Sequence, residues 1–441
     1  MFITILCFGS RGDVQPFVAL GVGLRQAGHN VCIATDKAFQ PLVLEHNLDY
    51  APVRGDIQRF MQGANGRAPE EIPGPIRLFR DMKREVHAEA RQMAQDCWQA
   101  SQNADLLVTG GPGAFVGATF SEKQRIPYVQ GYLQPVGLPT RAFPSSLIPP
   151  LPLRSGWFNR LTHLAVGQIF WQVMRGMFNE VRQEMLDLPP WSLAGPYRQA
   201  VRERHLTLMG YSPHVLPPPP DWDPEMIQVT GYWWLPPAPA WQPPPELCQF
   251  LSAGPPPVYI GFGSVGSRDA VAMTQAALDA LAETGQRGIL LRGWGGLAVG
   301  DLPETVLMVE NIPHDWLFPQ MAAVVHHGGA GTTGAGLRAG IPSLIIPHFA
   351  DQPFWGERVW RLGVGPKPIP KKKVTAAGLA AGIRAAVADP VMQERARQLS
   401  RQIQAEDGVA QAIALIEAYA QRWHKPNGSP RPRRKLLPIP H

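Results

Sequence analysis

The sequence predicts an α/β protein built from two Rossmann-like, doubly wound domains that face each other across a cleft. Three observations predict this fold. Apolar, β-rich runs alternate with amphipathic segments in the first half, the same alternation restarts in the second half, and a proline-rich stretch separates the halves. The 441 residues, 45% apolar and 17% charged, are enough for two domains with buried cores.

The first half opens with FITILCF at 2–8, which is too short for a signal peptide and predicts a buried strand. A helix is expected from about Val14 to Ala27. NVCIAT at 30–35 predicts the next strand, a helix follows near 39–46, and DLLVTGG at 105–111 predicts a later strand. This alternation is typical of a parallel sheet with helices on both faces.

Residues 213–257 contain PHVLPPPPDWDPE, WWLPPAPAWQPPPE and GPPPV, a proline density that helices and central strands do not tolerate. We therefore interpret this stretch as a semi-rigid linker. The expected units are an acceptor-binding domain at 1–215, the linker at 216–257, a donor-binding domain at 258–404, a C-terminal helix crossing back to the first domain at 405–423, and a basic, proline-rich, disordered tail at 424–441.

The second half repeats the opening pattern. PVYIGFGSVGS, at 257–267, predicts a strand and a Gly/Ser loop, and a helix is expected from about Ala270 to Thr284. RGILLRGWGG, TVLMVEN and AAVVHHGG predict further strands that end in loops. The carboxyl ends of the strands in the two sheets are expected to line the cleft between the domains.

The stretch VVHHGGAGTTGAGLRAG, at 324–340, predicts an anion site. A strand ends in His326 and His327, four small residues follow, and a helix is expected to start at Thr332 and Thr333. Free backbone N–H groups and the helix dipole attract an anion there, and small residues let it approach. The stretch lacks a P-loop lysine and Rossmann spacing, which disfavours ATP hydrolysis and NAD binding. The alternative is a glycine-rich turn that packs a helix tightly against a strand.

The first loop, FGSRGDVQP at 8–16, differs because Asp13 stands where the loop opens into a helix. A carboxylate would repel phosphate, so this loop is not predicted to bind one. Asp13 could instead cap the helix, or face a substrate across the cleft.

Almost the whole chain resembles one known family, on the motifs GSRGDVQP, VTGYWWL, GFGSVGS, NIPHDWLFPQ, HHGGAGTTGAGLRAGIPSLIIPHFADQPFWGERV and LGVGP. These resemble the family 1 UDP-glycosyltransferases, which have the GT-B fold. The likeness is greatest to the branch that includes sterol glucosyltransferases and glycopeptide-antibiotic glycosyltransferases. It implies that a nucleotide-sugar donor binds the C-terminal domain.

The resemblance implies that His327 and the loop after it hold the donor diphosphate. The backbone and hydroxyl groups of that loop belong to Gly329, Ala330, Gly331 and Thr332. Ser264, in GFGS, would face the diphosphate from a neighbouring loop. The UDP-sugar is a co-substrate, and neither a cofactor nor a metal is expected.

The resemblance also assigns the sugar and the base. Asp351 and Gln352, in HFADQPFWG, would grip hydroxyls of the transferred sugar, whereas Trp294, Ile312 and His314 would line the base pocket. Plant members carry a ribose-binding glutamate at a position that is an alanine here, Ala335. Specificity for uridine is therefore less well defined than binding of a sugar nucleotide.

An aspartate in the first loop resembles the antibiotic and sterol branch, which is thought to use it as the base. The implied mechanism is a single in-line displacement, in which Asp13 takes the proton of an acceptor hydroxyl as that hydroxyl attacks the anomeric carbon, with inversion of configuration. A positioned base contributes about 10²–10⁴-fold. Partial desolvation would raise the pKa of Asp13 and make it a stronger base.

The acceptor is expected to be lipophilic, such as a sterol or terpenoid. GYLQPVGLPTRAFPS, at 131–145, does not match the Pro-Trp-Thr-Arg-Thr segment expected of fungal sterol enzymes, so polyketide, carotenoid and glycolipid acceptors stay open. The aromatic run 157–178 is core, an acceptor pocket, or a membrane contact. A sugar-nucleotide epimerase, a non-catalytic sugar-nucleotide-binding protein and a membrane-surface scaffold are the rival functions.

Charge and cysteines narrow the partners and the location. The tail at 424–441 carries five of the net six positive charges, which leaves no basic face for nucleic acid in the body. The four cysteines are scattered, which favours the cytoplasm, with peripheral membrane contact as an addition. The DWD of Asp221–Asp223 lies in the linker and is not expected to bind metal, and Lys371–Lys373 are expected to form a solvated loop.

Overall fold

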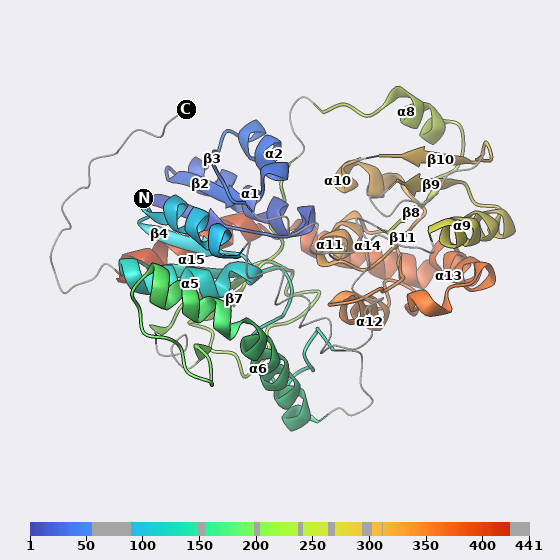
Figure 1. Cartoon of the computed structure of the whole chain (residues 1–441). Coiled ribbons are helices and arrows are strands. Elements are labelled where there is room, and N and C mark those ends of the chain that lie inside the picture. Colours follow the sequence, from blue (N-terminus) through green and yellow to red (C-terminus); the bar gives the residue numbers. More distant parts are fainter. Residues whose placement is uncertain are drawn as a thin grey trace.

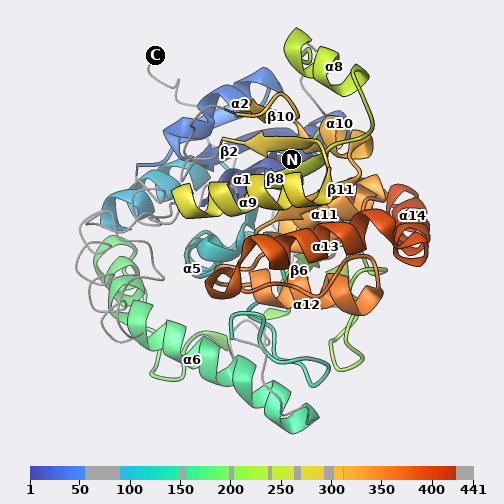
Figure 2. The same cartoon turned by 90° about the vertical axis from the view of Figure 1, so that its right-hand side faces the viewer.

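The computed structural model confirms the predicted fold, with two parallel sheets that are flanked by helices (Figures 1 and 2). It describes residues 1–54, 90–148, 155–197, 203–236, 241–262, 270–292, 302–310 and 312–423. We call the part around the N-terminal sheet the first domain and the part around the other sheet the second domain.

The sheet of the first domain has seven strands in the order β3-β2-β1-β4-β5-β6-β7. Their bounds are β1 Phe2–Leu6, β2 Asn30–Thr35, β3 Asp49–Pro52, β4 Leu106–Thr109, β5 Tyr128–Tyr132, β6 Leu206–Met209 and β7 Ile227–Val229. β1 pairs with both β2 and β4, so the strand order reverses beside it. Ligands of doubly wound folds bind at such a reversal, and the loop that leads from β1 into the helix that carries Asp13 begins there.

The sheet of the second domain has five strands in the order β10-β9-β8-β11-β12. Their bounds are β8 Val258–Gly261, β9 Gly288–Leu291, β10 Val306–Val309, β11 Ala323–His326 and β12 Ser343–Ile345. Here the order reverses between β8 and β11, which pair directly. The loop that follows β11 is the glycine-rich stretch, so it too lies at a reversal point.

Helices flank both sheets. Those of the first domain are α1 Arg11–Gln26, α2 Gln40–Glu45, α5 Ala114–Gln124 and α6 Gly156–Glu180, with the π-helix η4 Val181–Met185 after α6 and the short 3₁₀ segments η1 Lys37–Phe39 and η3 Gly111–Gly113. Those of the second are α9 Ala270–Thr284, α10 His314–Leu317, α11 Ala330–Ala339, α12 Gln352–Leu362, α13 Ala376–Ala388 and α14 Pro390–Gln404, with η5 Phe318–Gln320 and η6 Lys371–Lys373. The helix predicted at 270–284 has the same bounds in the structure, whereas α1 begins three residues before the predicted start.

The proline-rich stretch contains regular structure, which corrects its interpretation as linker alone. β7 adds to the edge of the first sheet, where a strand needs only one hydrogen-bonded neighbour. α8, Pro245–Ser252, has prolines at its N-cap and first position. Proline has no backbone N–H, and this costs nothing there because the N–H groups of the first helical turn have no partner within the helix.

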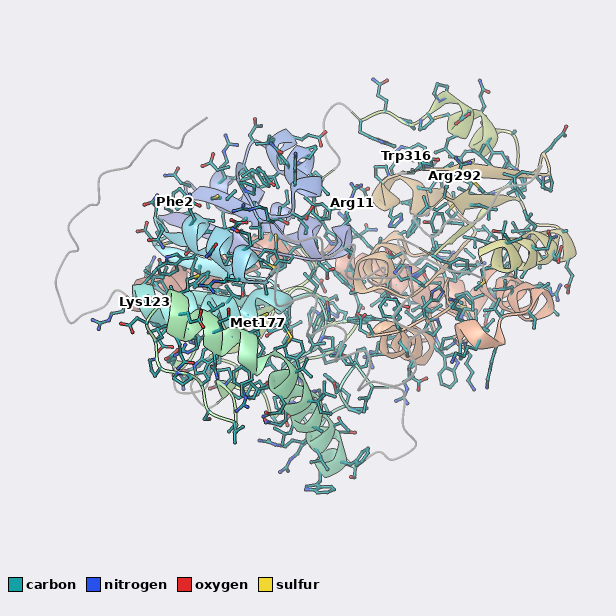
Figure 3. The ribbon with its side chains drawn as sticks, viewed as in Figure 1. Phe2, Arg11, Lys123, Met177, Arg292 and Trp316 are labelled. Atoms are coloured by element: carbon teal, nitrogen blue, oxygen red, sulfur yellow. The ribbon has the colours of Figure 1, made fainter. Side chains whose placement is uncertain are left out.

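The two domains meet at the N-termini of α1 and α11. A Cβ built on Gly331 would lie 4.0 Å from the Cα of Gly12, so the two helix starts are in contact. Arg11 lies between the domains in Figure 3. The last helix, α15 Gly408–Trp423, returns to the first domain and packs on α1.

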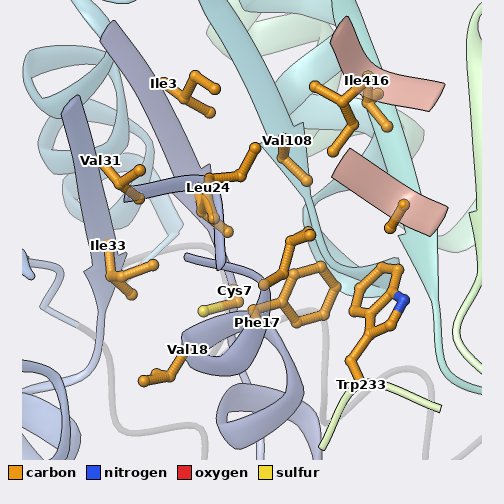
Figure 4. Close-up of a cluster of buried hydrophobic side chains, with 14 of the residues drawn as sticks. Ile3, Cys7, Phe17, Val18, Leu24, Val31, Ile33, Val108, Trp233 and Ile416 are labelled. Carbon is orange, nitrogen blue, oxygen red and sulfur yellow. The ribbon is translucent and has the colours of Figure 1, made fainter. Parts of the chain in front are cut away.

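The core of the first domain lies between its sheet, α1 and α15 (Figure 4). Phe17 packs edge-on against Trp233, with ring centroids 5.3 Å apart. Ile416 of α15 is fully buried in the same cluster. The C-terminal helix is therefore part of the hydrophobic core of the N-terminal domain. Among the described residues, no helix is both long and apolar enough to cross a membrane.

Candidate active site

Asp13 is the third residue of α1. Its Oδ2 accepts hydrogen bonds from the backbone N–H and the Oγ–H of Ser10, both at 2.8 Å. Ser10 is the N-cap residue, so the alternative in which Asp13 itself caps the helix is wrong. A carboxylate at this position that bonds back to the cap N–H stabilises the first turn, which explains why α1 begins at Arg11.

The Asp13 carboxyl group is half-buried. Burial raises its pKa above the usual value, and the two hydrogen bonds from Ser10 oppose that rise. Its negative charge also raises the pKa of Asp351 in the second domain. The carboxyl groups of Asp13 and Asp351, one from each domain, are therefore close enough for their charges to interact.

His326 and His327 have different environments. His326 is fully buried, and its Nδ1 accepts a hydrogen bond from the Gly328 N–H at 3.1 Å. Gly328 has a φ of 91°, and a Cβ there would come within 2.5 Å of Ile345. His326 thus supports the loop from below.

His327 lies against the loop at Gly329. A Cβ on Gly329 would come within 2.6 Å of His327 Nε2, so only glycine leaves room for the ring. Burial, with the charge of His348 as a second cause, lowers the pKa of His327 to about 4. Nδ1 of His327 has no hydrogen-bond partner in the described part of the chain. The ring is therefore neutral at pH 7 and can donate one N–H to a ligand.

α11 begins at Ala330, with Gly329 as its N-cap, two residues before the predicted start at Thr332. Its first intrahelical bond to the cap comes from the Thr333 N–H, which bonds the Gly329 carbonyl at 2.9 Å. The N–H groups of Ala330, Gly331 and Thr332 have no partner within the helix. They can bind an anion at the positive end of the helix dipole.

Asp351 and Gln352 start α12. Asp351 Oδ2 accepts a hydrogen bond from Trp355 Nε1 at 2.8 Å. Burial raises the pKa of Asp351 to about 6, the bond from Trp355 opposes the rise, and Asp13 adds to it. Gln352 is buried, and its Oε1 accepts from the backbone N–H groups of His348 and Phe349 at 2.8 and 3.2 Å. The oxygen of Gln352 thus fixes the loop, which leaves its NH₂ group for a ligand.

Ile312 and His314 come before and at the start of α10. Ile312 is buried, and the His314 ring stacks on Phe318 with centroids 4.3 Å apart. Burial lowers the pKa of His314 to about 4, and the charges of Arg11 and His327 contribute. His314 and His327 are therefore close enough for their charges to interact. Ser264 and Trp294 lie outside the described residues.

Two further residues that lie near these histidines were not singled out from the sequence. His348 precedes Asp351, and neither of its ring nitrogens has a hydrogen-bond partner among the described residues. Arg11 is exposed at the start of α1, and its charge acts on His314. The signals were available: His348 begins the HFADQ motif, and Arg11 is the only cation of the first loop.

The structure also describes the two charged segments that were not expected to bind a ligand, Asp221–Asp223 and Lys371–Lys373. Asp221 Oδ1 accepts from Thr140 Oγ1 at 2.6 Å, and Oδ2 from the Arg141 N–H at 2.9 Å. Lys372 and Lys373 are exposed in η6. Within the described ranges, no group of three His, Cys, Asp or Glu side chains could hold a metal ion.

Two family models match the chain, one in each domain. Residues 3–135 match the glycosyltransferase family 28 N-terminal domain. Residues 278–417 match the C-terminal domain of erythromycin biosynthesis protein CIII-like proteins.

The chain is also similar to curated sterol 3-beta-glucosyltransferases. It is 37% identical over 427 residues to the one from Emericella nidulans, which covers 94% of this chain and 30% of that protein. It is 39% identical over 425 residues to one from Arabidopsis thaliana, which covers 94% of this chain and 64% of that protein. The chain thus spans under a third of the fungal protein's length and under two thirds of the plant protein's length.

Solved structures share the fold. The glycosyltransferase of kitacinnamycin has a TM-score of 0.71 at 21% identity, covering 95% of this chain and 98% of its own. Glycosyltransferase VinC, solved in complex with dTDP, has a TM-score of 0.66 at 20% identity, covering 96% and 100%. At these identities the likeness confirms the two-domain fold and assigns no substrate.

Proposed function

We propose that the chain is a GT-B glycosyltransferase of the sterol 3-beta-glucosyltransferase branch, and that it transfers glucose from UDP-glucose to a hydroxyl of a sterol, with inversion. The observation that carries the proposal is the contact between the starts of α1 and α11. It brings a carboxylate and an anion-binding helix end, from different domains, to one place.

Asp13 is the proposed base. The acceptor oxygen forms a bond to the anomeric carbon, its proton passes to the Asp13 carboxylate, and the bond between the anomeric carbon and the diphosphate oxygen breaks. The electron pair of that bond leaves with UDP. Because burial raises the pKa of Asp13, the affinity of its carboxylate for the acceptor proton increases.

The leaving diphosphate is proposed to bind at the start of α11. The free N–H groups of Ala330, Gly331 and Thr332, with the N–H of neutral His327, are directed at charge that grows as the bond breaks. Arg11, across the domain boundary, adds a positive charge to the same space. These groups can neutralise the leaving group without a metal ion, so we propose metal-independent transfer.

The donor sugar is proposed to bind beside Asp351 and Gln352. Asp351 can accept from sugar hydroxyls with the oxygen that Trp355 does not use, and Gln352 can donate with its NH₂ group. Ile312 and His314 would contact the base. Glucose as the sugar is supported by the relatives' names, whereas Ala335 leaves dTDP-glucose as the alternative donor to UDP-glucose.

The acceptor proposal depends on the relatives, which are named for sterol 3-beta-glucosylation. A sterol is held in membranes, so we also propose peripheral membrane contact. The cysteines at 7, 32, 97 and 248 are all free, which supports a reducing compartment such as the cytoplasm.

The test is transfer from radiolabelled UDP-glucose to a panel of sterols and hydroxylated terpenoids, with EDTA present. We expect transfer by the wild type and a loss of about 10²–10⁴-fold in kcat for Asp13→Asn, with UDP affinity retained. Asp49→Asn, at an exposed carboxylate of β3, is the control and should transfer as the wild type does. Tight UDP binding with no transfer to any sterol would refute the acceptor, and conversion of the donor alone would indicate an epimerase.

A further inference from the structure

The first half of α6 has an inverted distribution of polar and apolar side chains. Asn159, Thr162 and His163 are buried, although all three are polar. Trp157, Leu161 and Leu164, in contrast, are 72%, 43% and 50% exposed. A helix on the surface of a protein in water normally buries its apolar face, so this arrangement needs a separate cause.

The polar face of α6 is buried because a loop binds it. Asn159 Nδ2 donates to the Arg141 carbonyl at 2.9 Å, the Ser145 N–H donates to Thr162 Oγ1 at 2.9 Å, and His163 Nε2 lies 3.0 Å from the Phe143 carbonyl. These bonds fix the rotation of the helix. The apolar side chains therefore point to solvent because hydrogen bonds on the opposite face fix the helix, and not because the helix is free to rotate.

Three exposed apolar side chains in the first half of α6 lie on one face of the helix. Trp157, Leu161 and Leu164 are spaced i, i+4 and i+7, which places them on one face of the helix. Leu193, 62% exposed, extends this face, because its carbonyl accepts from Gln168 and Gln172 one and two turns further along α6. We call these four residues the α6 strip. Figures 1 and 2 show the first turns of α6 extending away from both sheets, so a flat surface can reach them.

The charge around the strip suits an anionic surface. The sequence has no Asp or Glu from Lys123 to Asn179, a run that contains all of α6 up to its last residue. Arg160 is exposed on α6, and Arg141 is exposed beside the helix start, where a Cβ on Gly156 would lie 3.2 Å from Arg141 Cβ. One acid from another segment, Asp221, lies near Arg160 and bonds Thr140. Among the described residues that these contacts place beside the strip, two cations and one acid leave a net positive charge.

We infer that the α6 strip docks the first domain on a bilayer containing anionic phospholipid. Trp157 and the leucines enter the boundary between headgroups and acyl chains, while Arg141 and Arg160 contact lipid phosphates. The proposed function explains the use of such docking, since it brings the acceptor domain to a membrane-held sterol. Lipid binding itself needs no sugar donor, so it can be measured whether or not the transferase proposal holds.

The experiment is flotation of the full chain with vesicles of phosphatidylcholine, with and without phosphatidylserine. We expect binding that is stronger with phosphatidylserine, and a loss of about tenfold or more in the variant Trp157→Gln/Leu161→Gln/Leu164→Gln. Leu44→Gln is the matched control, because Leu44 of α2 is as exposed as Leu164, at 50%, and should bind as the wild type does. Arg160→Gln should remove about fivefold of the phosphatidylserine-dependent part only.

Each contrary result is distinguishable. Failure of the wild type to float, or undiminished flotation of the triple variant, overturns the inference. Loss of flotation on deletion of residues 424–441, with the triple variant unaffected, assigns binding to the basic tail instead. Light scattering that shows a dimer in the wild type and a monomer in the triple variant, without flotation of either, would assign the strip to a second copy of the chain. Equal melting temperatures of the variants and wild type exclude misfolding as the cause.

Discussion

At the scale of single residues, the pKa of Asp351 makes stability depend on pH. Its pKa is about 6 in the folded protein, against an ordinary value of 3.8, mainly because of burial. The folded state therefore favours the protonated acid, which stabilises the fold at pH values below 4 and loses that effect as pH rises through 6.

We predict that Asp351→Asn raises the free energy of unfolding by about 1–3 kcal/mol at pH 8 and changes it little at pH 3.5. The amide oxygen of asparagine can still accept the bond from Trp355 Nε1. Urea unfolding at both pH values measures the difference. An equal increase in the free energy of unfolding at both pH values would show that the charge of Asp351 does not cause the increase. Asp279→Asn, at an exposed carboxylate on α9, serves as control.

His327 allows a prediction about catalysis. The neutral ring donates to the diphosphate only if it points into the site, so His327→Phe, which keeps a ring without an N–H, should lower kcat by about 10²–10³-fold. Steady-state kinetics with UDP-glucose measure this, and the KM for the acceptor should stay within about threefold because the ring does not face it. His46→Phe, at the C-cap residue that follows α2, is the control. An acceptor KM that rises while kcat is unchanged would place His327 in the acceptor site instead.

At the scale of elements, the strands predicted from apolar runs are present in the structure, whereas β3, β5 and β6 were not predicted and two helix starts were placed late. β1, at Phe2–Leu6, and β11, at Ala323–His326, followed from the apolar runs FITILCF and AAVVHHGG. The predicted starts of α1 and α11 lie three and two residues after the observed starts. The local sequence does not show that Ser10 caps α1 through its bond to Asp13, or that Gly329 caps α11. β7 and α8 were missed because proline density was taken to exclude every strand and helix rather than only central and interior positions.

The first turn of α1 couples folding to the proposed chemistry, and Ser10→Ala tests that coupling. Loss of the cap should cost about 1 kcal/mol of stability. Because the hydrogen bonds from Ser10 lower the pKa of Asp13, their weakening should raise that pKa further, and the acidic limb of the kcat/KM profile should move to higher pH. Ser155→Ala removes the equivalent cap of α6, where Ser155 Oγ accepts from the Phe158 N–H at 3.2 Å. That control should lose stability without a shift of the profile, and an unshifted profile in Ser10→Ala would separate the cap from the base.

At the scale of the whole molecule, the site exists only because two domains meet. The sequence predicted the two loops, at 8–16 and 324–340, since each is formed by residues close in the chain. It did not predict the contact of Gly12 with Gly331 or the effect of Arg11 on His314, because both join residues about three hundred positions apart. Such pairs are set by domain packing and leave no local pattern.

The C-terminal helix joins the domains, and its core residue Ile416 gives the last prediction. Ile416 is fully buried between α1 and the first sheet, although it follows the second domain in sequence. Ile416→Ala should therefore lower the free energy of unfolding by about 2–5 kcal/mol, as buried Ile→Ala changes do. Val391→Ala on α14, at a side chain 57% exposed, should change it by less than about 0.5 kcal/mol. Denaturation followed by fluorescence, with and without UDP, measures both. If α15 joins the domains into one cooperative unit, UDP bound to the second domain should partly restore the melting temperature of Ile416→Ala. If Ile416→Ala instead leaves the unfolding transition of the second domain unchanged, the two domains unfold independently.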